Sequence, residues 1–189
     1  MKKFGILSVL VACVAFLFCA PATSALAAAQ TDKKPLVVYF TRSGNTKQVA
    51  EMIKNNTGAD IVEIETVESY PSDYDELTKV AKQQQQDNVR PLIKTKIANL
   101  DDYGIIFLGF PNWWSSMPMP VYTFVEQNGL NGRTIAPFVT HGGGQLGHSI
   151  EDLKKLVPES KVLKPFSVSG SRAGGAENDV KKWLSGIDK

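Results

Sequence analysis

Short apolar runs alternate with amphipathic segments along most of the chain. Each run is rich in β-branched and aromatic residues and is bounded by glycine, proline or polar residues, which indicates a buried strand. The segments between the runs carry apolar residues at helical spacing. The pattern predicts strands at 36–40, 59–64, 104–109, 134–139 and 161–168, and helices from 47 onward, from 70–74 to 83–86, and at 119–127, 149–156 and 177–187.

This alternation predicts an α/β fold, with a doubly wound parallel sheet and helices on both faces. Pro137 falls inside the fourth predicted strand, where it suggests a bulge or an irregular hydrogen bond. Residues 90–99 are expected to be loop or short irregular structure. Ligands of such sheets bind beyond the carboxyl ends of the strands. The loops after the first, third and fourth predicted strands are therefore the candidate site.

The first 27 residues have the pattern of a secretory signal. Lys2 and Lys3 precede an apolar stretch at 4–20, and Ala25-Leu26-Ala27 supplies the small residues of a cleavage site. A retained membrane anchor and lipoprotein-type cleavage at Cys13 are the alternatives. The sequence thus predicts a signal peptide at 1–27, a linker at 28–34, one domain at 35–189, and an exported, extracytoplasmic protein.

Removal of this segment changes the cysteine content and the charge. Cys13 and Cys19 are the only cysteines, so the remaining domain has no disulfide and no thiolate nucleophile. Loss of Lys2 and Lys3 turns the net charge of +2 into zero, which gives no electrostatic case for nucleic acid. The two histidines lack the spacing of a metal site, and no G-x-S-x-G nucleophile elbow occurs. We therefore predict no metal centre and no catalytic side chain.

The first loop, Thr41-Arg42-Ser43-Gly44-Asn45-Thr46, lies where a predicted strand passes into a predicted helix. Free backbone N–H groups and the positive end of the helix dipole point outward at such a position and can hold a phosphate. The loop lacks the lysine of a nucleoside-triphosphate loop, which favours a single terminal phosphate. The alternative is that Ser43, Asn45 and Thr46 only cap the helix.

The second loop, residues 110–120, contains two adjacent tryptophans between prolines. A large aromatic side chain at the mouth of a sheet suits stacking on a flat heteroaromatic ligand. The alternative is that one indole packs beneath the loop while the other lies on the surface. We expect one tryptophan to stack on the ligand and the other to have a structural role, and we assign the stacking role to Trp113 and not to its neighbour Trp114.

The third loop, residues 140–147, contains three consecutive glycines, which permit close approach of the backbone to a ligand. Gly142, Gly144 and Gly147 also match the dinucleotide pattern G-x-G-x-x-G. That match is a weak alternative, because it follows the fourth strand and too little chain remains to build a dinucleotide-binding half.

Together the three loops resemble those of the flavodoxins. The first loop is similar to the family's T/S-x-T/S-G-N-T phosphate loop, and residues 109–113 are similar to its first flavin-stacking loop. More closely, the chain resembles the branch of the family with a P-x-W-W second loop and a T-H-G-G third loop. The resemblance extends from Pro35 to the C-terminus and is also carried by Tyr70-Pro71, Asn88-Val89-Arg90-Pro91, Tyr103 and Phe124-Val125-Glu126.

This resemblance implies a flavodoxin-like five-stranded sheet in the order 2-1-3-4-5, with FMN as the cofactor. Each of the three loops would contact a different part of the flavin nucleotide. The phosphate would be held by Thr41, Arg42, Ser43, Gly44, Asn45 and Thr46, the isoalloxazine flanked by Pro111, Asn112, Trp113 and Trp114, and its pyrimidine edge contacted by Thr140, His141, Gly142, Gly143 and Gly144.

The resemblance also implies a redox function. The leading hypothesis is an exported FMN-binding electron-transfer protein, whose partners are redox proteins or small electron acceptors. The alternative is an FMN-dependent reductase of quinones or similar acceptors, because the third loop has His141 and glycines where many flavodoxins place a second aromatic residue. That flavin face would be open, or covered by Trp114 or His141. A third hypothesis, a fold that has lost its flavin, is disfavoured by the intact first loop.

Overall fold

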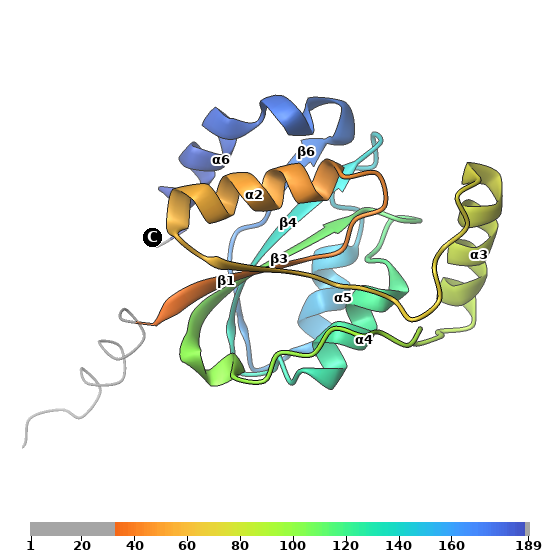
Figure 1. Ribbon diagram of the computed structural model, residues 1–189, viewed down its shortest axis with the longest axis horizontal. Helices are drawn as coiled ribbons and strands as arrows, with labels where there is room; N and C mark the ends of the chain where they lie inside the picture. The colour runs from red at the N-terminus through yellow and green to blue at the C-terminus, as the bar shows by residue number, and fades with distance from the viewer. Residues whose placement is uncertain (1–32, 188–189) are drawn as a thin grey trace, which may run out of the picture.

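The computed structural model describes residues 33–187 (Figure 1). The predicted signal peptide at 1–27 and most of the predicted linker at 28–34 lie outside the described residues. The strands are β1 (Lys34–Tyr39), β2 (Asp60–Glu63), β3 (Tyr103–Pro111), β4 (Thr134–His141), β5 (Lys161–Val162) and β6 (Phe166–Ser169). The helices are α2 (Asn45–Thr57), α3 (Tyr74–Gln86), α4 (Met119–Gln127), α5 (Ser149–Leu156) and α6 (Glu177–Leu184), with 3₁₀ helices η1 (Leu100–Asp102) and η2 (Gly170–Gly175).

The strands form one parallel sheet in the order β2-β1-β3-β4-β5, and β6 also pairs with β4. Figure 1 shows α2 and α6 on one side of the sheet and α4 and α5 on the other. The predicted doubly wound fold and strand order are confirmed. The sheet order also means that the loops after β1, β3 and β4 leave three adjacent strands at the same edge.

The last predicted strand, 161–168, is interrupted between β5 and β6. This interruption explains how β4 accommodates Pro137 without losing a hydrogen bond to its neighbour. The pairing of β3 with β4 is regular through Pro137, so β4 has no bulge there. The N–H of Leu163 donates to the carbonyl of Ile135 at 2.8 Å, and pairing with β4 resumes at Phe166. Because backbone groups two residues apart face the same side of a strand, the nitrogen of Pro137 points at the gap between β5 and β6. The missing N–H thus faces an interrupted neighbour.

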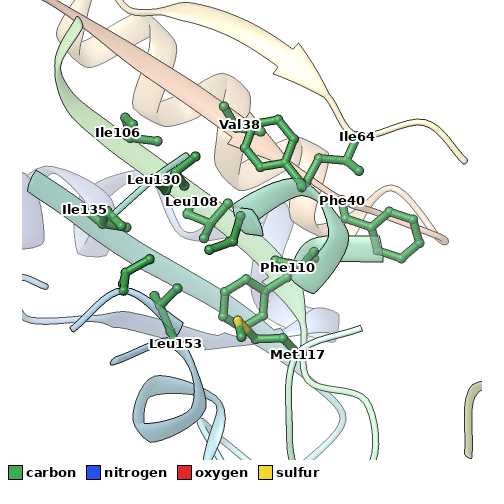
Figure 2. Packing of buried hydrophobic residues seen from close by; sticks show 14 of the residues in the cluster. Val38, Phe40, Ile64, Ile106, Leu108, Phe110, Met117, Leu130, Ile135 and Leu153 are labelled. Atoms are coloured by element: carbon green, nitrogen blue, oxygen red, sulfur yellow. The ribbon is translucent and has the colours of Figure 1, made fainter. Parts of the chain in front are cut away.

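Alternate residues of the central strands supply two separate cores. Leu36 and Val38 of β1 face a cluster with Leu108 of β3 and Ile135 of β4, covered by α4 and α5 (Figure 2). Val37 and Tyr39 face the opposite cluster, which α2 and α6 cover. Burial on both faces explains why these strands are almost continuously apolar instead of alternating.

Helix α3 belongs to neither layer. Figure 1 shows it beyond the carboxyl ends of β3 and β4. Its buried residues are Leu77 and Ala81. Thr66 and Ile93 form an antiparallel bridge at the base of this excursion, and the N–H of Val67 donates to the carbonyl of Leu92 at 2.8 Å. The chain therefore leaves the sheet after β2, forms α3 at the edge where the loops meet, and returns beside its own path.

No helix within residues 33–187 has both the length and the apolar character needed to cross a membrane.

Candidate functional site

The three predicted loops meet around an open hollow of about 440 Å³ at the carboxyl edge of the sheet. We call this the first hollow. Loop residues predicted to bind a cofactor supply much of its lining: Thr41, Arg42, Ser43, Asn45, Thr46, Pro111, Asn112, Trp113, Thr140, His141 and Gly142. Gly44, Gly143 and Gly144 lie in the same loops outside the lining, and Trp114 lines a second hollow instead.

The start of α2 is open toward a ligand. Gly44 is the N-cap residue with φ +83°, and no side chain caps the helix. The first α-helical bond runs from the N–H of Gln48 to the carbonyl of Gly44 at 3.0 Å, so the N–H groups of residues 45–47 have no partner inside the helix. The structure gives no side-chain capping hydrogen bond at this helix start, so the alternative that Ser43, Asn45 and Thr46 only cap the helix gains no support. Unpaired donors and the helix dipole favour an anion here.

The charge of the first hollow also favours an anion. Arg42 is the charged side chain of its described lining, which contains no carboxylate. The guanidinium of Arg42 donates to the carbonyl of Ser72 and lies 6.0 Å from the ring centroid of Tyr74. Hydroxyl and amide groups from the first loop supply further neutral donors. A terminal phosphate fits this set of donors, whereas a metal ion would lack carboxylate ligands.

Two polar contacts join the loops to one another. The hydroxyl of Thr46 lies 2.9 Å from that of Thr140, in buried surroundings. The side-chain amide of Asn112 donates to the carbonyls of Gly144 and Gln145 at 3.2 and 2.7 Å. The first loop is thereby tied to the third, and the second to the third.

A tight turn at residues 113–116 shapes the second loop. Backbone hydrogen bonds run both ways between Trp113 and Ser116, at 2.9 and 3.0 Å. Trp114 and Ser115 between them have φ values of +50° and +65°. Left-handed backbone costs a non-glycine residue roughly 1–2 kcal/mol, so other contacts must hold this turn.

The contacts that hold the turn come from the start of α5. The carbonyl of Ser115 accepts the N–H of His148 at 2.8 Å. The buried hydroxyl of Ser116 donates to the carboxylate of Asp152 at 2.6 Å, and His148 Nδ1 lies 3.1 Å from the same oxygen. The carboxylate sits between serine and histidine, so this is not the order of a hydrolase triad. We assign the cluster to positioning the second loop.

The ionisation of Asp152 reflects that cluster. Partial burial of the carboxyl group acts to raise its pKa. Hydrogen bonds from Ser116 and Tyr122, together with the His148 charge, outweigh burial and hold the pKa of Asp152 below its usual range. The charged form of Asp152 is therefore the form that anchors the turn.

The two tryptophans have different surroundings. Trp113 packs edge-on against Phe40 and Tyr70, with ring centroids 5.5 and 5.2 Å away, and lines both hollows. Trp114 is 47% exposed, and its indole N–H donates to the carbonyl of Thr78 in α3 at 3.0 Å. Trp113 thus lies beside both hollows, and its contact with a flavin stays a prediction.

His141 has a defined hydrogen-bond role in the third loop. Its Nδ1 accepts the N–H of Gly143 at 3.1 Å. In the neutral ring the proton is therefore on Nε2, so His141, which lines the first hollow, keeps one N–H donor.

Some residues of the first hollow were not predicted as site residues. They are Ser169, Gly170 and Ser171 after β6, and Tyr74 and Leu77 in α3. The loop after β6 leaves the same sheet edge as the others, so the topological argument could have identified it. The α3 residues carried no such signal, because the position of α3 follows from the excursion at 66–93 and not from the strand order.

A second hollow of about 420 Å³ adjoins the first. Tyr74, Leu77, Thr78 and Ala81 of α3 form one wall, and residues 112–114 form the other. Tyr74, Leu77, Asn112 and Trp113 line both hollows. A polar space at a helix start therefore continues into a more apolar, aromatic one. Within residues 33–187, no group of histidine, cysteine and acidic side chains is arranged to hold a metal ion.

Comparisons with known proteins agree with this arrangement. A sequence model of the flavodoxins matches residues 34–187. A proposed flavoprotein from Bacteroides eggerthii DSM 20697 is 32% identical with a TM-score of 0.73, and the match covers 84% of this chain and 99% of that chain. Another proposed flavoprotein, from Bacteroides uniformis ATCC 8492, is 26% identical with a TM-score of 0.71. That match covers 81% of this chain and 98% of that chain.

A flavoprotein from Lactobacillus acidophilus NCFM, solved in complex with FMN, is 23% identical with a TM-score of 0.65, covering 80% of this chain and 99% of that chain. This likeness shows the common fold. No curated protein matches the sequence. Because the family match spans nearly the whole described domain, the chain belongs to the flavodoxin family.

Proposed function

We propose that the protein binds FMN across the two adjoining hollows and transfers electrons between redox partners. The observation that carries this proposal is the uncapped start of α2, which faces a carboxylate-free hollow that opens into an aromatic one. Membership of the flavodoxin family supports FMN as the cofactor, and so does the FMN complex of the Lactobacillus flavoprotein.

Each end of the two hollows suits one part of the cofactor. The backbone N–H groups at the start of α2, the side chains of Ser43 and Asn45, and the charge of Arg42 would hold the phosphate. Trp113 would flank the ring, and the Nε2 proton of His141 would face its polar edge. FMN, when bound, supplies one- and two-electron transfer, while the protein orients the ring and sets its electrostatic surroundings.

The first hollow also favours a second candidate function. It is open, and its third loop presents His141 and glycines, not a second tryptophan, tyrosine or phenylalanine that would cover a bound flavin. An FMN-dependent reductase of quinones or similar acceptors would use this uncovered face. Steady-state turnover with NAD(P)H and a quinone separates the two candidates, because a carrier is expected to react slowly with both and rapidly with a protein partner.

A titration of the cofactor-free protein tests the proposed function. We expect FMN to bind with a change in its absorbance, and riboflavin to bind at least about 100-fold more weakly, since it lacks the charge-assisted phosphate contacts. Replacing Ser43 with alanine should weaken FMN binding and leave riboflavin binding unchanged. Absence of any spectral change with FMN would contradict the proposal.

We further propose that the protein works outside the cytoplasm. The support is the signal pattern at 1–27. Because Lys2-Lys3 is not a twin-arginine signal, the chain would cross the membrane unfolded and acquire FMN afterwards. N-terminal sequencing and flavin content of the extracytoplasmic fraction test this. An uncleaved chain retained in the cytoplasm would count against it.

A further inference from the structure

The third loop has no tryptophan, tyrosine or phenylalanine to cover the second face of a flavin, whereas α3 places a tyrosine beside both hollows. Tyr74, the first residue of α3, lines the first hollow and the second. We propose that Tyr74 is the residue that covers the flavin ring on the face opposite the second loop. This inference rests on the proposed binding of FMN.

The spacing of residues on α3 supports this assignment. Counted from Tyr74, the residues Leu77, Thr78 and Ala81 lie three, four and seven positions further on, so all four share one face of the helix. That face lines the second hollow opposite residues 112–114. The hollow therefore has an aromatic residue on each wall, Trp113 from the loop and Tyr74 from the helix.

The exposure of Tyr74 points the same way. Leu77 and Ala81 on this face are 3% and 6% exposed, while Tyr74 is 65% exposed. Tyr74 also takes part in none of the ring pairs found among the described residues. A large exposed aromatic side chain at the junction of two hollows is what a binding surface requires.

The surroundings of Tyr74 fix its position. The carboxylate of Asp73 accepts the N–H of Glu76 at 2.8 Å and caps α3 at this residue. The guanidinium of Arg42, from the first loop, lies 6.0 Å from the ring centroid of Tyr74. A cation over an aromatic ring is attracted to it, so the phosphate end of the site holds the ring that would cover the flavin.

The second loop holds the helix as a whole. The indole N–H of Trp114 donates to the carbonyl of Thr78 at 3.0 Å, one turn after Tyr74. Trp114 therefore positions α3, and we assign the ring-covering role to Tyr74 and not to Trp114. The two loops and α3 together form a slot with defined walls.

Proton NMR of the protein with and without FMN tests the proposal. A flat aromatic ligand on Tyr74 should shift its ring protons upfield, and the loss of the same signals in Tyr74→Phe identifies them. We expect Tyr74→Ala to raise the Kd for FMN and for riboflavin by the same factor, roughly tenfold, as is typical of one stacked ring. Tyr74→Phe should bind as the wild type does, because it keeps the ring.

Leu92→Ala is the matched control, since Leu92 is 68% exposed and lines neither hollow of the site. It should leave both Kd values unchanged. If the wild type binds FMN but the Tyr74 signals do not move upfield, the inference about Tyr74 is wrong, whatever the affinity of the variants. If the wild type does not bind FMN at all, the proposed function itself fails. Circular dichroism of each variant confirms that it folds.

Discussion

The hydroxyl oxygens of Thr46 and Thr140 lie 2.9 Å apart, although the two residues are 94 positions apart in the sequence. Thr46 is in the first turn of α2, and Thr140 is near the carboxyl end of β4. The contact is buried and fixes the helix start against the sheet next to the first hollow.

Removing both of these hydroxyls should cost less than the sum of the costs of removing each one alone. Thr46→Val leaves the Thr140 hydroxyl buried without this partner, and we expect a loss of about 1–3 kcal/mol in the free energy of unfolding. The double variant Thr46→Val with Thr140→Val should lose less than the sum of the two single variants. Urea unfolding of all four proteins measures the coupling. Additive losses would mean that the hydroxyls do not interact.

Gly147 should not tolerate a side chain. A Cβ at this position would lie 2.1 Å from the carbonyl oxygen of Ser115, and the residue has φ +53°. We expect Gly147→Ala to cost about 2–3 kcal/mol of stability and to displace the 113–116 turn. Thermal unfolding measures the loss. Gly175→Ala, whose Cβ would meet no atom within 4 Å, is the control and should unfold close to the wild type.

The anchoring of the second loop should depend on pH through Asp152. Because folding lowers the pKa of this carboxyl group from 3.8, its contribution is complete above that value and is lost as the pH falls through the lower folded value. We expect Asp152→Asn to be less stable than the wild type by about 1–2 kcal/mol at pH 7. Unfolding curves from pH 7 down to acid should show the two proteins converging. A constant difference would contradict the assignment.

Trp114 should hold α3 in place. Trp114→Phe removes the indole donor to Thr78 and keeps an aromatic ring near Lys82, whose ammonium lies 4.9 Å from the indole. Loss of one hydrogen bond worth about 1 kcal/mol should speed amide exchange in α3 roughly fivefold. The amides of α4 provide the internal control. Equal acceleration in both helices would indicate general destabilisation instead.

Much of the fold was predictable because its signals are local. The runs at 36–40 and 104–109 are apolar on both sides, which marks central parallel strands, and the structure places β1 and β3 there. The meeting of the three loops followed from strand order alone. Residues 88–91 and 124–126, two of the segments that resemble the flavodoxin branch, also prove to be in contact. The guanidinium of Arg90 donates to both carboxylate oxygens of Glu126 at 2.7 and 2.8 Å.

Other features depend on contacts that no local pattern reports. The spacing of Tyr74, Leu77 and Ala81 marks a helix, yet it does not say which surface that helix meets. Whether Pro137 disturbs its own strand depends on the neighbouring chain, where the pairing with β4 is interrupted between β5 and β6. The separate surroundings of Trp113 and Trp114 follow from left-handed backbone at residue 114, which nothing in the sequence requires.

The excursion that carries α3 has a consequence for how the site fills. The bridge between Thr66 and Ile93 closes its base, and beyond it the helix buries only two side chains. Few buried contacts favour local opening of such a segment while the sheet stays intact. Opening would carry Tyr74 away from the hollow. The opening of this one segment would then set the rate of cofactor exchange. A chain that folds without FMN could therefore bind FMN later, without unfolding the whole domain.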